Sequence, residues 1–125
     1  MLRFVLAWLS PVFQGMGFGV LAMVLHEAGH LAVALLLGLR IYKFGVNWKG
    51  MYVLREAGPL ASNLLVSLAG PVTNLLLSFA WYHKASFSLA NLCFGLVNLL
   101  PIQGSDGERI FQSIEDAKRR QTPSG

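Results

Sequence analysis

The chain has 125 residues, of which 54% are hydrophobic and 13% are charged, and its formal net charge is +4. Soluble domains carry roughly 25% charged residues, and a soluble protein this small needs a large polar surface. The composition therefore argues against a soluble globular domain, a disordered chain and a disulfide scaffold, and it favours a membrane protein with a single domain over residues 1–125.

Three apolar segments predict membrane-spanning helices, each of which needs about 20 mostly apolar residues. We expect the first helix over residues 13–39, after an interfacial apolar segment over residues 1–12 that Pro11 separates from it. A cleaved signal peptide is the alternative interpretation of the N-terminus. The other two helices are expected over residues 60–82 and 86–100, and Pro101 ends the last of them.

Two shorter elements are expected outside the membrane. Apolar and polar residues alternate with period two over residues 41–55, which predicts a small β-hairpin. Ile110, Phe111 and Ile114 recur at helical spacing, which predicts an amphipathic helix over residues 107–119 on the membrane surface. The expected fold class is an all-α membrane protein, a three-transmembrane-helix bundle with a small cytoplasmic β-hairpin and a C-terminal amphipathic helix.

The distribution of basic residues predicts the orientation. Arg3 and Lys84 would lie on one side of the membrane, and the other eight lysines and arginines on the opposite side. By the positive-inside rule, the chain is a multi-pass integral membrane protein with its N-terminus outside and its C-terminus in the cytoplasm. This topology and contact with the lipid bilayer account for the basic net charge, so we expect no nucleic-acid partner.

Each expected helix carries a stripe of small and polar residues at a spacing near 3.6, as in helix faces that pack together in membranes. The stripes predict that the three helices turn these faces inward. The members are Gly15, Gly19, Ala22, His26, Gly29 and Val33 on the first helix, Asn63, Ser67, Gly70, Asn74 and Ser78 on the second, and Ser88, Asn91, Gly95 and Asn98 on the third.

The residues His26-Glu27-Ala28-Gly29-His30 form an H-E-x-x-H motif inside the first helix. Two histidines four residues apart share a helix face and can bind one zinc ion, and the adjacent Glu27 can serve as a general base. Glu27 is also the only charged residue between Phe4 and Leu39, where an unpaired carboxylate is costly. A functional role is therefore favoured over the alternative, in which these side chains only hydrogen bond between helices.

A catalytic zinc site needs a third protein ligand and an open position for water. The candidates near the membrane are Glu56, His83 and Asp106. Asp106 follows the break of the third helix, but Ser105-x-x-Glu108 resembles a capping box, so this region also has a purely structural interpretation. The spacing alone favours Asp106 as a ligand only slightly.

Three motifs resemble those of the site-2 protease family of intramembrane zinc metalloproteases. They are His26-Glu27-Ala28-Gly29-His30, Ala69-Gly70-Pro71-Val72-Thr73-Asn74 and Asn98-Leu99-Leu100-Pro101-Ile102-Gln103-Gly104-Ser105-Asp106-Gly107. Their order also matches, and the resemblance spans residues 15–112, which would make the chain a minimal catalytic core. Gln103 departs from the family pattern, because a second proline usually stands at that position.

The resemblance implies that His26, His30 and Asp106 bind Zn²⁺ and that Glu27 activates water. It also implies that Asn98 and Asn74 hold the substrate backbone or the developing oxyanion, although interhelical hydrogen bonding is an alternative role for both. The implied function is a zinc-dependent endopeptidase of regulated intramembrane proteolysis. Its partners would be a transmembrane substrate protein, cleaved within or near its membrane segment, and a regulatory membrane protein.

A substrate helix must unwind before hydrolysis, and an exposed edge of the predicted hairpin could hold the unwound segment by strand addition. Three other functions are alternatives to proteolysis for this chain. A non-catalytic membrane scaffold or chaperone could use the same fold, whereas the charge distribution opposes a soluble zincin protease. A metal transporter would need several ionisable groups along a path, and this chain has one such cluster.

Overall fold

The computed structural model describes residues 1–48 and 50–121, except for the side chain of Leu2. In these residues the elements follow the order α1 (Leu2–Leu36), β1 (Ile41–Asn47), β2 (Gly50–Arg55), α2 (Leu60–Ala80), α3 (Ala85–Leu99) and α4 (Asp106–Gln121). The two strands pair antiparallel, which confirms the predicted hairpin. The bounds of α2, α3 and α4 lie close to those expected from the sequence.

The first helix differs from the prediction, because α1 is continuous from Leu2 and includes Pro11. A proline inside a helix removes one backbone donor, and α1 stays helical through Pro11 despite this loss. The C-terminal end comes earlier than expected. Gly38, at φ 71°, donates its N–H to Leu35, and Leu39 donates to Ala34. This pair of bonds is the Schellman arrangement that ends a helix at a glycine.

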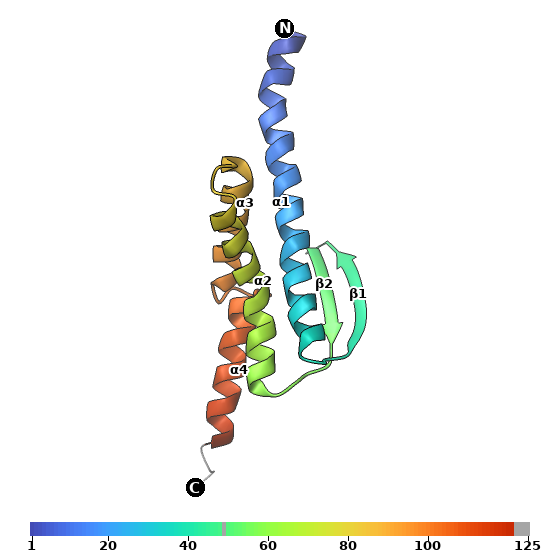
Figure 1. Cartoon of the computed structure of the whole chain (residues 1–125), viewed down its shortest axis with the longest axis vertical. Helices are drawn as coiled ribbons and strands as arrows, with labels where there is room; N and C mark the ends of the chain where they lie inside the picture. Colours follow the sequence, from blue (N-terminus) through green and yellow to red (C-terminus); the bar gives the residue numbers. More distant parts are fainter. Residues whose placement is uncertain (49, 122–125) are drawn as a thin grey trace.

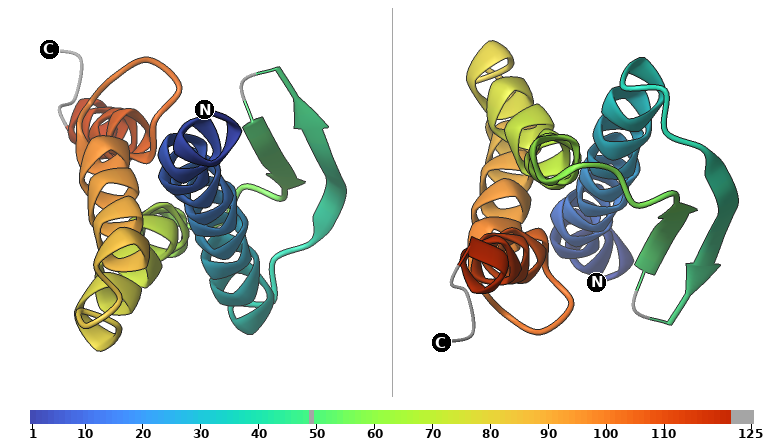
Figure 2. Two further views of the ribbon diagram at one scale, coloured as in Figure 1. Left: turned by 90° about the horizontal axis from the view of Figure 1, so that it is seen from above. Right: turned by 90° about the horizontal axis from the view of Figure 1, so that it is seen from below.

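The helices and the hairpin pack around the C-terminal half of α1. In Figure 2, α1 lies between the hairpin on one side and α2, α3 and α4 on the other. The N-terminal part of α1 projects beyond the other elements, and the two chain termini lie at opposite ends (Figure 1). Helix α4 runs lengthwise beside the first half of α2, and its apolar Phe111 and Ile114 stay exposed, so its placement on the membrane surface stays a prediction.

Within the described part of the chain, two helical segments are long and apolar enough to cross a membrane, Arg3–Leu36 and Leu60–Ala80. Helix α3 is also apolar but has only 15 residues. At 1.5 Å per residue such a helix rises about 22 Å, less than the roughly 30 Å of a bilayer core. The count of three spans therefore stays a prediction.

The inward-facing stripes are confirmed from Ala22 onward. Their buried members are Ala22 and His26 on α1, Ser67, Gly70, Asn74 and Ser78 on α2, and Asn91 and Gly95 on α3. His30, which is not a member of the predicted stripe, is buried as well. At the two earlier glycines of the first stripe, Gly15 and Gly19, a built Cβ would meet no atom of the described residues within 4 Å, so neither permits a close helix approach there. By contrast, a Cβ on Gly29 would lie 2.9 Å from the carbonyl oxygen of Ala69. A glycine at position 29 thus permits the close approach of α1 and α2 at the level of the histidines.

Candidate metal centre

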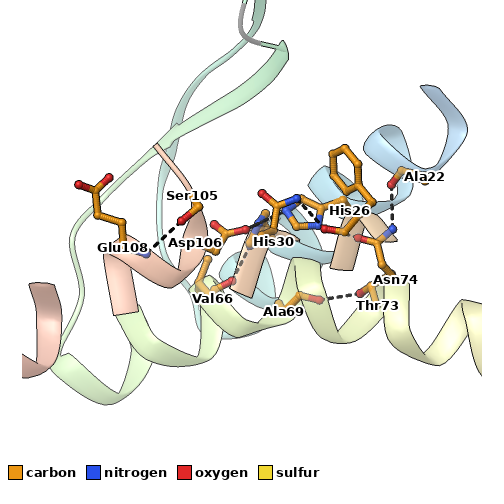
Figure 3. Close-up of polar contacts among 12 residues, drawn as sticks. Ala22, His26, His30, Val66, Ala69, Thr73, Asn74, Ser105, Asp106 and Glu108 are labelled. Atoms are coloured by element: carbon orange, nitrogen blue, oxygen red, sulfur yellow. Dashed lines mark hydrogen bonds and ion pairs between the residues drawn. The ribbon is translucent and has the colours of Figure 1, made fainter. Parts of the chain in front are cut away.

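The three predicted metal ligands meet at one point, although they come from distant parts of the chain. Asp106 Oδ2, at the first residue of α4, lies 2.8 Å from His26 Nε2 and 3.1 Å from His30 Nε2. The two Nε2 atoms are 3.0 Å apart. All three side chains are buried, and Figure 3 shows the histidines and Asp106 pointing toward one another.

The outer nitrogen of each imidazole is held by an acceptor. His26 Nδ1 donates to Asn74 Oδ1 at 2.7 Å, and His30 Nδ1 donates to the carbonyl oxygen of Val66 at 2.6 Å. The orientation of the Asn74 amide follows from its Nδ2, which donates to the carbonyl of Ala22 at 2.9 Å. With a proton on each Nδ1, a neutral histidine presents the lone pair of Nε2 to the centre, which is the form that binds metals.

This donor set fits a divalent cation such as zinc. Two imidazole lone pairs and a carboxylate oxygen facing one another at 2.8–3.1 Å require a proton or a cation between them. Tetrahedral zinc with ligand bonds of 2.0–2.2 Å places its ligand atoms roughly 3.3 Å apart, close to these separations. Two histidines and one carboxylate are also a ligand set of catalytic zinc sites, which leave a fourth position for water.

Glu27 lies close to both histidines. One of its carboxylate oxygens and a nitrogen of each histidine lie within 4.8 Å of one another, and its side chain is half-buried. Glu27 lines a cavity of about 150 Å³ together with His26, His30, Asp106 and Asn98. A carboxylate on the wall of a cavity that also contains the ligand atoms is placed to exchange a proton with a water molecule there.

The loop before α4 delivers Asp106 to the histidines. Ser105 Oγ donates to the carbonyl of Leu100 at 2.6 Å and accepts the N–H of Glu108 at 3.2 Å, while Glu108 Oε2 accepts the N–H of Gly104 at 2.6 Å. The sequence left a helix cap and a metal ligand as alternative interpretations of this region. Both are present on different residues, because Ser105 caps α4 and Asp106 faces the histidines. Because Ser105 holds this loop together, Asp106 reaches the site although Gln103 replaces the usual proline.

The carboxyl of Asp106 is ionised at neutral pH. Burial by itself would raise its pKa, but its contacts with His26 and His30 outweigh burial and lower the pKa to about 2. Its position at the start of α4 also favours the negative charge, because helix N-termini carry a partial positive charge. An ionised carboxylate is the form that can bind a metal.

The two predicted asparagines occupy different surroundings. Asn74 is fully buried, and besides Ala22 its amide donates to Asn91 Oδ1 at 2.8 Å. These are the interhelical hydrogen bonds that the sequence left as an alternative, so Asn74 positions His26 and does not face the cavity. Asn98 donates to the carbonyl of Phe94 at 2.9 Å and lines the cavity, where a substrate could contact it.

Three parts of the site were not predicted from the sequence. Asn91 is fully buried and orients Asn74, and the carbonyl of Val66 orients His30. Gly70 lies directly against the histidines, since a Cβ there would come within 2.7 Å of His26 Cε1 and Nε2. The signal for Asn91 was its place on a polar stripe, whereas a backbone carbonyl leaves no signal in a sequence.

The other ligand candidates lie elsewhere. Glu56 accepts the N–H of Arg40 at 3.3 Å beside the hairpin. His83 lies in the turn between α2 and α3 and packs edge-on against Tyr82. Neither residue lines the cavity, so Asp106 is the candidate that the fold brings to the two histidines.

Comparisons with known proteins identify relatives. The chain is 34% identical over 106 residues to stage IV sporulation protein FB of Bacillus subtilis, which covers 74% of this chain and 37% of that protein. It is 29% identical over 111 residues to a zinc metalloprotease of Methanocaldococcus jannaschii, covering 78% of this chain and 33% of the relative. The chain therefore spans about a third of the length of these relatives.

The fold is also similar to a solved structure. The site-2 protease from Methanocaldococcus jannaschii matches with a TM-score of 0.72 and 27% sequence identity, over 81% of this chain and 53% of that one. No family model matches the chain.

Proposed function

The chain belongs to the site-2 protease family, and on this premise we propose that it is a zinc-dependent intramembrane endopeptidase. Its substrate would be a membrane-tethered regulatory protein, cleaved within or near a transmembrane segment. The observation that carries the proposal is the convergence of His26 Nε2, His30 Nε2 and Asp106 Oδ2 at a cavity whose wall includes Glu27.

The residues of the cavity divide the chemistry between them. A bound zinc ion would supply Lewis acidity, which lowers the pKa of a water molecule and polarises the scissile carbonyl. Glu27 accepts the proton of the attacking water and returns it to the amide nitrogen as the C–N bond breaks, so the products are a carboxylate and an amine. Asn74 and the carbonyl of Val66 keep both imidazoles in the tautomer that binds the metal.

The hairpin suits the binding of an unwound substrate. Met51, Val53 and Arg55 of β2 line the cavity, and β2 lies between α1 and β1 (Figure 2). Because β1 pairs with only one edge of β2, the other edge can bond to an extended segment by strand addition. Asn98, which also lines the cavity, is placed to hold the backbone of the same segment.

The proposed topology follows from the charges. The N-terminus would lie outside, and the hairpin and α4 would lie on the cytoplasmic side, where most of the basic residues gather. In this topology α3 is a third, short pass. Exposed apolar side chains on the projecting part of α1, such as Phe4, Trp8 and Phe13, would contact the bilayer or a regulatory membrane protein.

The test compares the parental chain with Glu27→Gln, reconstituted with a single-pass reporter substrate. We expect Glu27→Gln to retain zinc but to lose cleavage by on the order of 10²-fold or more, because proton transfer at the reacting atoms is lost. Glu115→Gln, an exposed α4 site whose partner is Arg119, is the matched control and should cleave normally. Parental activity in Glu27→Gln would refute the mechanism. A parental chain that binds zinc and substrate without cleaving would instead be the scaffold or chaperone.

A further inference from the structure

Two arginines line both the cavity and an adjoining groove. Arg55 ends β2 and Arg109 lies on the first turn of α4, and both line the cavity that contains the histidines. Both also line an adjoining groove of about 400 Å³ that continues along α4 past Gln112 and Ser113. A chain that enters the cavity from the proposed cytoplasmic side through this groove therefore passes both arginines.

Among the described residues, no carboxylate forms an ion pair with either guanidinium. Arg55 Nη1 donates to the carbonyl of Glu56 at 2.9 Å and to Asn63 Oδ1 at 3.0 Å, so neutral acceptors hold its side chain in place. The Arg109 guanidinium makes no hydrogen bond or ion pair with any described residue. One cation is thus held by neutral acceptors, and the other has its hydrogen-bond donors available to a ligand.

The two positive charges affect each other. Burial and, second, the charge of Arg109 both lower the pKa of Arg55. Like charges that interact in this way are unfavourable, and an anion bound by both reduces the repulsion. Planar guanidinium groups bind carboxylates through paired, charge-assisted hydrogen bonds, which are stronger than neutral ones.

The acidic residues nearby do not supply this anion. Glu27 and Asp106 line the same cavity, but a divalent ion on the histidines and Asp106 would balance their two charges. Asp116 lines the groove two turns farther along α4, and the described ion pairs do not join it to either arginine. With the metal bound, the cavity and its opening are therefore left with the positive charge of Arg55 and Arg109.

We propose that Arg55 and Arg109 bind the carboxylate of an aspartate or glutamate side chain in the substrate, on the cytoplasmic side of the cleaved bond. The pair then selects substrates by an acidic residue at that position. This inference rests on the proposed peptidase function. The carboxylate formed by hydrolysis has the same chemistry, but it arises from every substrate and cannot produce a preference between glutamate and glutamine.

The first experiment measures kcat/KM on a set of single-pass reporter substrates. In each set of three, one position on the cytoplasmic side of the scissile bond carries Glu, Gln or Lys, and the rest of the substrate is unchanged. We expect the parental chain to prefer one of the Glu substrates over its Gln counterpart by on the order of tenfold, as for a charge-assisted hydrogen bond. Arg109→Gln should abolish the preference, and Arg109→Glu should shift it toward Lys. Arg119→Gln, on the same helix but outside the cavity, is the control and should keep it. Zinc content should stay parental in every variant.

The second experiment measures binding without cleavage. Fluorescent peptides with Glu or Gln at the selected position are titrated into two variants that should not cleave them. One variant carries Glu27→Gln alone, and the other carries both Glu27→Gln and Arg109→Gln. Tighter binding of the Glu peptide only where Arg109 is present supports the inference, even if no chain cleaves. Equal binding of both peptides, or equal parental cleavage of Glu and Gln substrates, overturns it and leaves the peptidase proposal intact. If the parental chain cleaved no reporter substrate but the Glu peptide still bound more tightly than the Gln peptide, only the peptidase proposal would be overturned.

Discussion

The hydrogen bond between Asn74 and His26 makes a sharp prediction for Asn74→Leu. Asn74 is fully buried and joins three helices, since it contacts His26 Nδ1 at 2.7 Å, the carbonyl of Ala22 at 2.9 Å and Asn91 Oδ1 at 2.8 Å. Leucine has a similar size but accepts no hydrogen bond. The substitution therefore removes the group that sets the ring orientation and the tautomer of His26 without opening a large cavity.

Two magnitudes follow from these contacts. Loss of the outer partner of a metal-binding histidine costs about 10- to 100-fold in metal affinity, which equals about 1.4–2.8 kcal/mol. The His26 N–H and the Asn91 Oδ1 are also left buried without their partner, at about 1–3 kcal/mol each. We expect Asn74→Leu to bind zinc at least tenfold more weakly and to unfold at a lower temperature than the parental chain.

The assay is competition for zinc with a chromophoric chelator in detergent, with thermal unfolding measured on the same samples. Ser78→Ala is the matched control, because it removes the contact of 3.0 Å between Ser78 Oγ and Ser88 Oγ, which also joins α2 to α3 but lies away from the histidines. This control should lose some stability and keep the parental zinc affinity. If folded Asn74→Leu bound zinc as tightly as the parental chain, Asn74 would not be what holds His26.

Two further substitutions test the geometry of the site. Gly70→Ala should weaken zinc binding at least tenfold, because the added Cβ would lie within 2.7 Å of His26 Cε1 and Nε2 and must displace the ring, whereas Gly15→Ala, with no atom within 4 Å, should not. Equal zinc affinity of the two variants would contradict the described contact. Asp106→Asn should lower zinc affinity by about 10²-fold or more while α4 stays capped by Ser105, as measured by metal analysis and circular dichroism. Unchanged zinc content in Asp106→Asn would mean that Asp106 is not a ligand.

Sequence patterns predicted the elements best where each element depends on its own residues. Alternation over residues 41–55 predicted the hairpin, because side chains of a strand alternate between its two faces. Sequence patterns were less informative at two other points. Pro11 suggested a boundary that α1 does not have, since one missing donor does not end a long helix. The amphipathic pattern of α4 identified an apolar face, but it did not show that the helix packs along α2.

The sequence by itself determined the apolar character of the helices and the pairing of His26 with His30. The helices are apolar because charged residues are scarce in their segments. His26 and His30 pair because residues four apart share a helix face by local geometry alone. Only the tertiary structure decided which carboxylate completes the site and which groups orient the imidazoles. Asp106 lies 80 residues from His26 along the chain, and Asn74 lies 48 residues from it. Such contacts depend on how the helices pack, and in a membrane that packing is decided by the small and polar residues that let two backbones approach.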